Sequence, residues 1–406
     1  MKLPSLSIQT LAVKLTAVGE RVLVSGHPWL YDQSIESINK DGLPGDLAII
    51  FNRKTNKLLG IGLYDPTSEI IIKVLSVRKK LNLNLDWFKE KFSAARQLRE
   101  KLLSTSTNGI RYCFGENDGL PGIIIDGYDQ VYVLKIYTPA WIPHLIAISE
   151  AMIETYNPAT LVLRLSRRTS SYCVENKIDL SDGQILYGRL ENPEVPFLEY
   201  GLTFTAQVLE GHKTGYFLDH RYNRNAIASL AKGKHVLDVF SYAGGFTVHA
   251  LATGARSVTS IDISKHAMLS CEKHIALNDC KGIHIPIIED AFQALHRLNK
   301  EGKKYDIVVI DPPSFAKRKS EISRAKHSYV KLARLGASLT QINGILLLAS
   351  CSSRISMEEF KELHQSSLGI DDGVFAIVDE TTHDVDHPIA FPEGAYLKSV
   401  YYKRLR

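Results

Sequence analysis

The sequence has no run of about 20 consecutive apolar residues, the length that a membrane-spanning helix needs. Its first residues, Met1 to Ser7, lack the apolar core of a signal peptide. Its five cysteines are scattered and show no CxxC or Cys/His spacing of the kind that binds a metal. We therefore expect reduced thiols, no metal, no membrane partner and a cytoplasmic location.

The chain also lacks internal repeats and low-complexity tracts, and its 406 residues exceed the length of one ordinary domain. Apolar residues make up 45% of it, which is enough for about two or three cores. A net charge of +5 favours a nucleic acid as partner without requiring one. The oligomeric state is open, with a homodimer among the alternatives.

The residue patterns divide the chain into three parts. Residues 1–77 predict a small β-barrel, because short β-type runs alternate there with turn signals. Such runs are Arg21–Val24, Asp46–Phe51 and Ile70–Leu75. Residues 78–192 predict an α+β domain that opens with a helix at Leu85–Leu103, where apolar residues have helical spacing and charges occupy the other face.

The third part, residues 193–406, alternates strand and helix patterns. After a first strand at His235–Val239, the pattern predicts a strand, a helix and two more strands. These are Ser257–Asp262, residues 265–277, residues 305–311 and residues 345–349. This order is typical of a doubly wound, Rossmann-like parallel sheet.

The first strand of this part runs into a glycine turn, where an open α/β sheet accepts a ligand. Gly244 and Gly245 let the backbone approach that ligand closely. The turn departs from the GxGxxG pattern of dinucleotide enzymes, which place a pyrophosphate at the helix start. With Asp238, Phe240 and Tyr242 nearby, it suits a ligand that has an amino-acid end and no phosphate, such as S-adenosylmethionine.

Two more carboxylates follow the next strands. Asp262 can accept both ribose hydroxyls, although it could instead cap the helix that begins near Ser264. Asp290 can accept the adenine amino group with Phe292 beside the ring, although it could be a solvated turn acid. The full set of residues expected to bind the cofactor is Asp238, Phe240, Ser241, Tyr242, Gly244, Gly245, Asp262, Ile263, Asp290, Ala291, Asp311 and Pro312.

The candidate catalytic residues are Asp311 and Cys351. Asp311 opens an Asp-Pro-Pro loop after a buried strand, and Pro312 and Pro313 make that loop rigid. The Asp311 side chain can hydrogen-bond a pyrimidine ring nitrogen and stabilise the charge that develops when the ring is attacked. Cys351 follows the next strand, which brings it to the same sheet edge; a buried core thiol is the alternative. A thiolate that adds to carbon 6 of cytosine makes carbon 5 nucleophilic, so the pair predicts a covalent route to base methylation.

These motifs resemble the ribosomal large-subunit RNA methyltransferase I family, which uses S-adenosylmethionine to form 5-methylcytidine in 23S ribosomal RNA. Residues 26–29, 45–46 and 60–64 resemble its RNA-binding PUA barrel, and Gly115–Gly122 its central-domain signature. Gly211–Arg221 resembles the segment before its methyltransferase fold, with His212 where the family usually has glutamine. The resemblance implies large-subunit ribosomal RNA as partner, cofactor-pocket roles for the strand-end acids and the nucleophile role for Cys351.

Several alternatives stay open. An Asp-Pro-Pro-Phe-type loop also serves direct methylation of an exocyclic amine, and an RNA-binding assembly factor could keep the cofactor pocket as a relic. Two basic clusters could contact RNA or be solvated faces, one after the Asp-Pro-Pro loop and one in the central part. They contain Lys317, Arg318, Lys319, Arg324 and Lys326, and Arg164, Arg167 and Arg168. Asp219 and Arg221 could serve the cofactor or form structural ion pairs.

Overall fold

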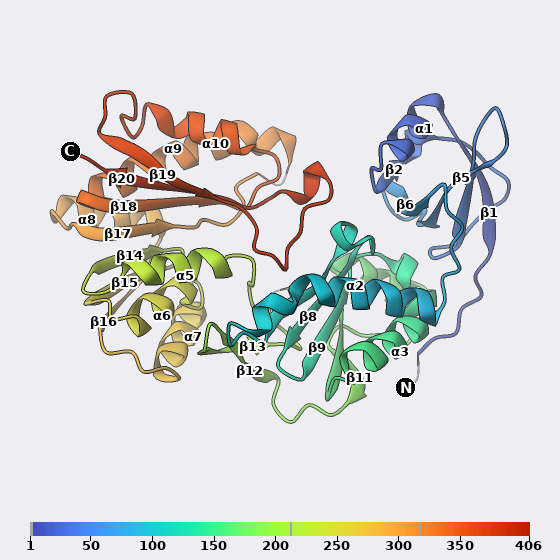
Figure 1. The fold of residues 1–406 in the computed structure, drawn as a ribbon, viewed down its shortest axis with the longest axis horizontal. Helices are drawn as coiled ribbons and strands as arrows, with labels where there is room; N and C mark the ends of the chain where they lie inside the picture. Colours follow the sequence, from blue (N-terminus) through green and yellow to red (C-terminus); the bar gives the residue numbers. More distant parts are fainter. Residues whose placement is uncertain (1–2, 212, 317) are drawn as a thin grey trace. The chain divides into compact units, whose positions relative to one another are not determined.

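The computed structural model describes residues 3–211, 213–316 and 318–406, which form two compact units (Figure 1). The first unit contains the chain up to Leu198 together with Thr205–Leu218 and Val385–Phe391. The second contains Glu199–Phe204, Asp219–Asp384 and Pro392–Arg406. The finer division into parts 1–77, 78–192 and 193–406 stays a prediction.

A six-stranded sheet in the order β2-β6-β5-β4-β1-β3 forms the amino-terminal part of the first unit. Its elements are β1 (Thr10–Leu15), α1 (Ala17–Val24), β2 (Trp29–Tyr31), η1 (Asp32–Ser34), β3 (Ile35–Ile38), β4 (Leu47–Phe51), β5 (Leu58–Tyr64) and β6 (Ile70–Val77). Leu11, Val13 and Leu15 of β1 are buried while their neighbours are exposed, the pattern of a strand with one face on a core. The sheet curls into a half-barrel (blue in Figure 1), in agreement with the predicted small β-barrel.

The expectation of a β-type run at Arg21–Val24 is wrong, because these residues are the last turn of α1. The Thr16 side chain accepts a hydrogen bond from the Gly19 backbone N–H at 3.1 Å and so caps the helix. Gly19 and Leu23, four residues apart, are the buried residues of this helix. A run of four residues is too short to distinguish this helical spacing from a strand pattern.

The central sheet has five strands in the order β11-β10-β9-β8-β7. The elements are α2 (Leu85–Leu103), β7 (Gly109–Phe114), η2 (Gly115–Asp118), β8 (Ile123–Tyr128), β9 (Val131–Ile136), η3 (Pro139–His144), α3 (Leu145–Tyr156), β10 (Thr160–Leu165), α4 (Arg167–Glu175) and β11 (Gln184–Gly188). The predicted helix at Leu85–Leu103 is confirmed. Its Phe88 and Phe92 side chains pack in a buried apolar core that also contains Trp141. Among the described residues, no helix combines the length and the hydropathy needed to cross a membrane.

A two-stranded sheet, β12 (Glu194–Glu199) with β13 (Leu202–Gln207), precedes the seven-stranded sheet of the second unit. The elements of that larger sheet and its helices are α5 (Arg221–Leu230), β14 (His235–Val239), α6 (Gly245–Ala252), β15 (Ser257–Asp262), α7 (Lys265–Ala276), β16 (Ile283–Ile288), α8 (Ala291–Lys300), β17 (Tyr305–Ile310), η4 (Lys319–Glu321), α9 (Ile322–Leu339), β18 (Thr340–Ser350), α10 (Met357–Gln365), β19 (Phe375–Thr381), η5 (Pro392–Gly394) and β20 (Lys398–Arg404).

The strand order of the seven-stranded sheet is β16-β15-β14-β17-β18-β20-β19. The first five strands in this order pair in parallel, and β20 pairs antiparallel with both β18 and β19. One core joins the sheet to α8, α9 and α10, and another joins it to α5 and α6. Helices therefore cover both faces (Figure 1), which confirms the predicted doubly wound, Rossmann-like fold.

Candidate active site

The loop after β14 is held in an unusual conformation beside the end of β15. Phe240, Tyr242 and Gly244 have positive φ angles of 63°, 47° and 77°. Residues other than glycine rarely adopt this backbone conformation. The Ser241 backbone N–H donates to the Ile261 carbonyl at 3.0 Å. A Cβ atom on Gly244 would lie 2.2 Å from Cys271 Sγ. Close packing inside the protein therefore requires this glycine, whatever ligand the loop binds.

Asp238, the fourth residue of β14, fixes the helix that follows this loop. Its Oδ2 accepts hydrogen bonds from the Thr247 backbone N–H at 3.1 Å and from the Thr247 hydroxyl at 2.7 Å. Burial, with a smaller contribution from the negative charge of Asp311, raises the pKa of Asp238 to about 7, although the hydrogen bonds from Thr247 oppose this shift. The structure thus shows a carboxyl group that positions the first turn of α6, while direct contact with the cofactor stays a prediction.

Asp262 lies at the end of β15, as the sequence predicts. Its Oδ2 accepts from the Tyr242 backbone N–H at 2.9 Å and its Oδ1 from the Ser264 N–H at 2.8 Å. The cap of α7 is Ser264, which accepts from Ala267, so the alternative that made Asp262 the helix cap is wrong. The adjacent Ile263 is 73% exposed, which leaves an apolar side chain open beside a half-buried carboxylate.

Asp290 caps α8, because its Oδ1 accepts from the Gln293 backbone N–H at 3.1 Å. Asp290 thus has a structural role at a half-buried position, and the alternative of a solvated turn acid stays open. Ala291 begins the helix and is buried. The Phe292 ring, predicted to lie beside adenine, has the Lys331 ammonium 4.9 Å from its centre. A pocket role for Asp290 has to be compatible with its capping bond.

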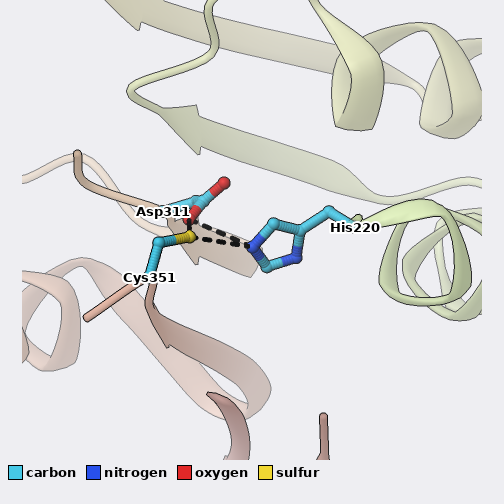
Figure 2. Close-up of side chains that lie close together, drawn as sticks. All are labelled: His220, Asp311 and Cys351. Carbon is cyan, nitrogen blue, oxygen red and sulfur yellow. Dashed lines mark hydrogen bonds and ion pairs between the residues drawn. The ribbon is translucent and has the colours of Figure 1, made fainter. Parts of the chain in front are cut away.

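Asp311 and Cys351 follow the adjacent parallel strands β17 and β18, and the structure brings their side chains together with His220 (Figure 2). Cys351 Sγ lies 3.9 Å from Asp311 Oδ1 and 3.9 Å from His220 Nε2. His220 Nε2 lies 3.2 Å from the same Asp311 oxygen. Burial opposes protonation of His220, but the adjacent Asp311 carboxylate outweighs it and holds the pKa of His220 above its ordinary value.

His220 is the residue that sequence reasoning missed at this site. It immediately precedes α5 and is only 3% exposed. It lies 131 positions before Cys351, and no spacing pattern could connect the two. Its place in the family-like segment Gly211–Arg221 was the one available signal. The atoms of the three side chains that could bind a metal ion lie within 4.8 Å of one another. The expectation that no metal binds stays a prediction.

The Asp-Pro-Pro loop is anchored against the end of β18. Pro312 is buried, and the Phe315 ring packs against Tyr329 with centres 5.2 Å apart. The Ser350 hydroxyl donates to Tyr329 at 2.9 Å, and the Ser352 hydroxyl contacts the Ala316 carbonyl at 3.5 Å. Ser352 thus contacts this loop directly, and Ser350 is connected to it through Tyr329 of α9, as expected for a rigid platform beside the thiol.

Of the other cysteines, Cys113, Cys173 and Cys280 pack in apolar clusters, whereas Cys271 Sγ lies 3.9 Å from His284 Nε2. Cys113, Cys173 and Cys271 are buried and Cys280 is half-buried. Burial raises the pKa of each of these thiols, for Cys280 to about 11. They are therefore poor nucleophiles near neutral pH.

The basic residues divide into paired and exposed groups. Arg164 is buried and pairs with Asp182 at 2.8 Å, so the structure favours a structural role for it. Arg221 is buried and bonds Asp384 at 3.2 Å, which likewise favours structural pairing. The exposed residues of the two clusters are Arg167, Arg168, Arg318, Lys319 and Arg324. Of these, Arg168 also pairs with Asp65 at 3.8 Å. Lys326 pairs with Glu359 at 2.9 Å. Predictions on His212 and Lys317 lie outside the described residues.

The fold and this edge of the sheet define a class I methyltransferase joined to a PUA-like domain. The model of the S-adenosylmethionine-dependent methyltransferase family matches residues 182–361, and that of the PUA-like domain matches residues 13–77. The crystal structure of SMU.776 complexed with SAH has a TM-score of 0.82 and 23% identity, covering 98% of this chain and all of that one. Its likeness supports the fold.

Two relatives identify the family. The chain is 38% identical over 407 residues to a ribosomal RNA large subunit methyltransferase of Deinococcus radiodurans, with 99% of each chain covered. It is 30% identical to the ribosomal RNA large subunit methyltransferase I of Erwinia tasmaniensis, covering 93% of this chain and 96% of that protein. The chain belongs to the ribosomal large-subunit RNA methyltransferase I family, and its cofactor is S-adenosylmethionine.

Proposed function

We propose that this chain methylates carbon 5 of a cytosine in large-subunit ribosomal RNA through a covalent adduct between Cys351 and the base. The observation that carries this proposal is the position of Cys351 Sγ, 3.9 Å from Asp311 at the carboxyl ends of β17 and β18. The names of the relatives from Deinococcus radiodurans and Erwinia tasmaniensis support the RNA substrate.

The residues after β14, β15 and β16 fit S-adenosylmethionine. Asp262 would accept the ribose hydroxyls, and the exposed Ile263 would pack against the adenine, which suits an apolar side chain beside a carboxylate. The loop at residues 240–245, held by Asp238 through α6, would surround the amino-acid end. Asp290 would face the adenine amino group. When bound, the cofactor supplies a methyl group attached to a sulfonium.

The chemistry of the base falls to Cys351 and Asp311. The Cys351 thiolate adds to carbon 6, which makes carbon 5 nucleophilic. Asp311 shares a proton with ring nitrogen 3, and this proton offsets the negative charge that thiolate addition places on the ring. Figure 2 shows that the second carboxylate oxygen of Asp311 is directed away from Cys351 and His220, which suits a contact with the base. Once carbon 5 carries the methyl group, water takes up the carbon 5 proton, the electron pair of that C–H bond restores the carbon 5–carbon 6 double bond, and the thiolate leaves carbon 6 with the electrons of the C–S bond.

The test is incubation of the full chain with tritiated S-adenosylmethionine and unmodified large-subunit RNA, followed by digestion to nucleosides. We expect label in 5-methylcytidine with the wild type and none with Cys351→Ala. Cys280→Ala is the matched control, because this thiol is half-buried in the same unit. Label in another nucleoside that survives Cys351→Ala would favour amine methylation. Cofactor binding without any transfer would favour an assembly factor.

A further inference from the structure

Besides Asp311, Cys351 has a second polar neighbour, His220, which does not belong to β17, β18 or the loops that follow them. His220 precedes α5, and its Nε2 lies 3.9 Å from Cys351 Sγ. This distance is within the range of a sulfur hydrogen bond when one of the two atoms, Sγ or Nε2, carries the hydrogen. Figure 2 shows the imidazole edge directed at the sulfur and at Asp311. The thiol thus lies beside a group that can take up a proton near neutral pH.

The opposite ring nitrogen of His220 contacts a third residue. Its Nδ1 lies 3.2 Å from the side-chain amide of Asn223, one turn into α5. That amide contacts three hydroxyl groups of β19 and β20, which are Thr381 at 2.6 Å, Ser399 at 3.1 Å and Tyr401 at 2.8 Å. Because hydroxyls both donate and accept, either end of the amide can face Nδ1. Asn223 therefore fixes the ring plane in both the neutral and the protonated state of His220.

We propose that His220 is a catalytic residue that accepts the proton of the Cys351 thiol, and that Asn223 is its positioning residue. A nucleophile, a base within reach and a third group that orients the base form the arrangement shared by many covalent catalysts. The use of this pair on a pyrimidine rests on the proposed function. Activation of the thiol does not, and it can be measured without RNA.

The proton transfer balances within the three side chains. The Sγ–H bond breaks and leaves its electron pair on sulfur, while the lone pair of His220 Nε2 forms the new N–H bond. The resulting imidazolium faces the Asp311 carboxylate at 3.2 Å, which stabilises its charge. When the Cys351–carbon 6 bond later breaks, its electron pair returns to sulfur and Nε2 gives the proton back.

Other charges near the pair are identifiable. Asp311 and Asp219 favour the imidazolium, and Arg224 opposes it, although Arg224 itself pairs with Glu199 at 2.6 Å. Lys398 lies on the thiol side, where its ammonium donates to the Ser352 carbonyl at 2.6 Å. Since Lys398 stays in place when His220 is replaced, a change that follows His220→Gln belongs to the histidine.

The experiment is the rate of Cys351 alkylation by iodoacetamide as a function of pH, followed in the full chain by peptide mass spectrometry. In the wild type we expect Cys351 to titrate below the ordinary thiol pKa of about 8.5. His220→Gln should slow alkylation at pH 7 at least tenfold, and Asn223→Ala by a smaller factor. His364→Gln is the matched control and should change nothing, because this buried histidine bonds Tyr402 away from the site.

A His220→Gln profile equal to that of the wild type, in a variant that still binds S-adenosylmethionine, overturns the proposal. If the variants fail to bind the cofactor, a wild-type Cys351 pKa at or above about 8.5 still overturns it. Failure of the proposed function gives a different result. In that case Cys351 titrates as expected while labelled RNA yields no 5-methylcytidine.

Discussion

The carboxyl group of Asp238 lies at the end of β14 with 1% of the residue exposed, and burial raises its pKa to about 7. The unfolded chain releases this proton near pH 4, so the folded state holds more protons between pH 4 and 7. The contribution of Asp238 to the free energy of unfolding is fully present below pH 4, and it is lost as the pH rises to 7. We predict that the free energy of unfolding falls over this range by on the order of 3 kcal/mol.

Asp238→Asn isolates this effect, because an amide oxygen can still accept from Thr247 but carries no charge. Urea unfolding without cofactor should show a shallower pH dependence between pH 4 and 7 in the variant, which at pH 8 should be at least as stable as the wild type. The exposed Asp279→Asn is the control. Parallel curves for Asp238→Asn and the wild type would show that Asp238 is ionised throughout.

Gly244 combines two constraints, a φ of 77° and a Cβ position 2.2 Å from Cys271 Sγ. Gly233 has a similar φ of 71° but nothing within 4 Å of its Cβ position. Both alanine variants carry backbone strain of about 1 to 2 kcal/mol. Only Gly244→Ala adds a clash with the core, which typically costs a further 1 to 3 kcal/mol or so. The urea midpoint should fall clearly further for Gly244→Ala; equal shifts would mean that α7 yields freely at Cys271.

At the scale of elements, α2 shows how much a local signal can predict. Its range Leu85–Leu103 follows from apolar spacing, and the Asn84 side chain accepts from the Trp87 N–H at 3.1 Å as its cap. We predict that Asn84→Ala lowers the free energy of unfolding by about 1 kcal/mol. Asn82→Ala, at an exposed position just before the helix, is the control and should change it by less than about half of that. Equal urea midpoints would mean that the helix start is held by packing alone.

The strand-end acids were predictable for the same kind of reason. In a parallel sheet the carboxyl ends of successive strands share one edge, so Asp262, Asp290 and Asp311 could be placed there from the strand patterns. Cys351 followed from the next strand, β18. The chemistry-bearing residues that come from strands of this sheet were thus accessible to pattern reasoning.

His220 and Asn223 were not accessible to it, because neither belongs to a strand end. Their neighbourhood depends on where α5 packs and on β20, which lies between β18 and β19 although it is last in the chain. Ser399 and Tyr401 reach Asn223 only because of that insertion. Local patterns do not encode strand order, and long-range hydrogen bonds between hydroxyls leave no periodic signal in the sequence.

At the scale of the whole molecule, the chain returns to its first unit twice after leaving it, with Thr205–Leu218 and Val385–Phe391. The later segment contributes Asp386, whose carboxylate accepts from the Arg111 backbone N–H at 3.0 Å within that unit. Sequence order suggests division into successive blocks and cannot reveal such returns. Tertiary contacts therefore decide which segments of the chain belong to each unit.

The net charge of +5 is also a property of the whole molecule, and its distribution decides how RNA would bind. Arg318, Lys319 and Arg324 are exposed in the segment after the Asp-Pro-Pro loop. If the substrate is ribosomal RNA, as proposed, each phosphate contact there releases counterions on binding. The affinity for RNA therefore falls as the salt concentration rises. Replacing all three by glutamine should weaken RNA binding and reduce the log–log salt slope by about 2, at roughly 0.7 for each single-strand contact.

The control replaces three exposed lysines of the same unit, Lys281, Lys300 and Lys303, by glutamine, so that the change in net charge is identical. Filter binding of large-subunit RNA between 50 and 200 mM salt, about the range over which this effect is large, separates the two variants. A reduced slope in the first variant alone assigns the RNA path to the segment beside Asp311 and Cys351. Equal slopes in both would mean that the total charge of the protein attracts RNA and that these three residues are a solvated face.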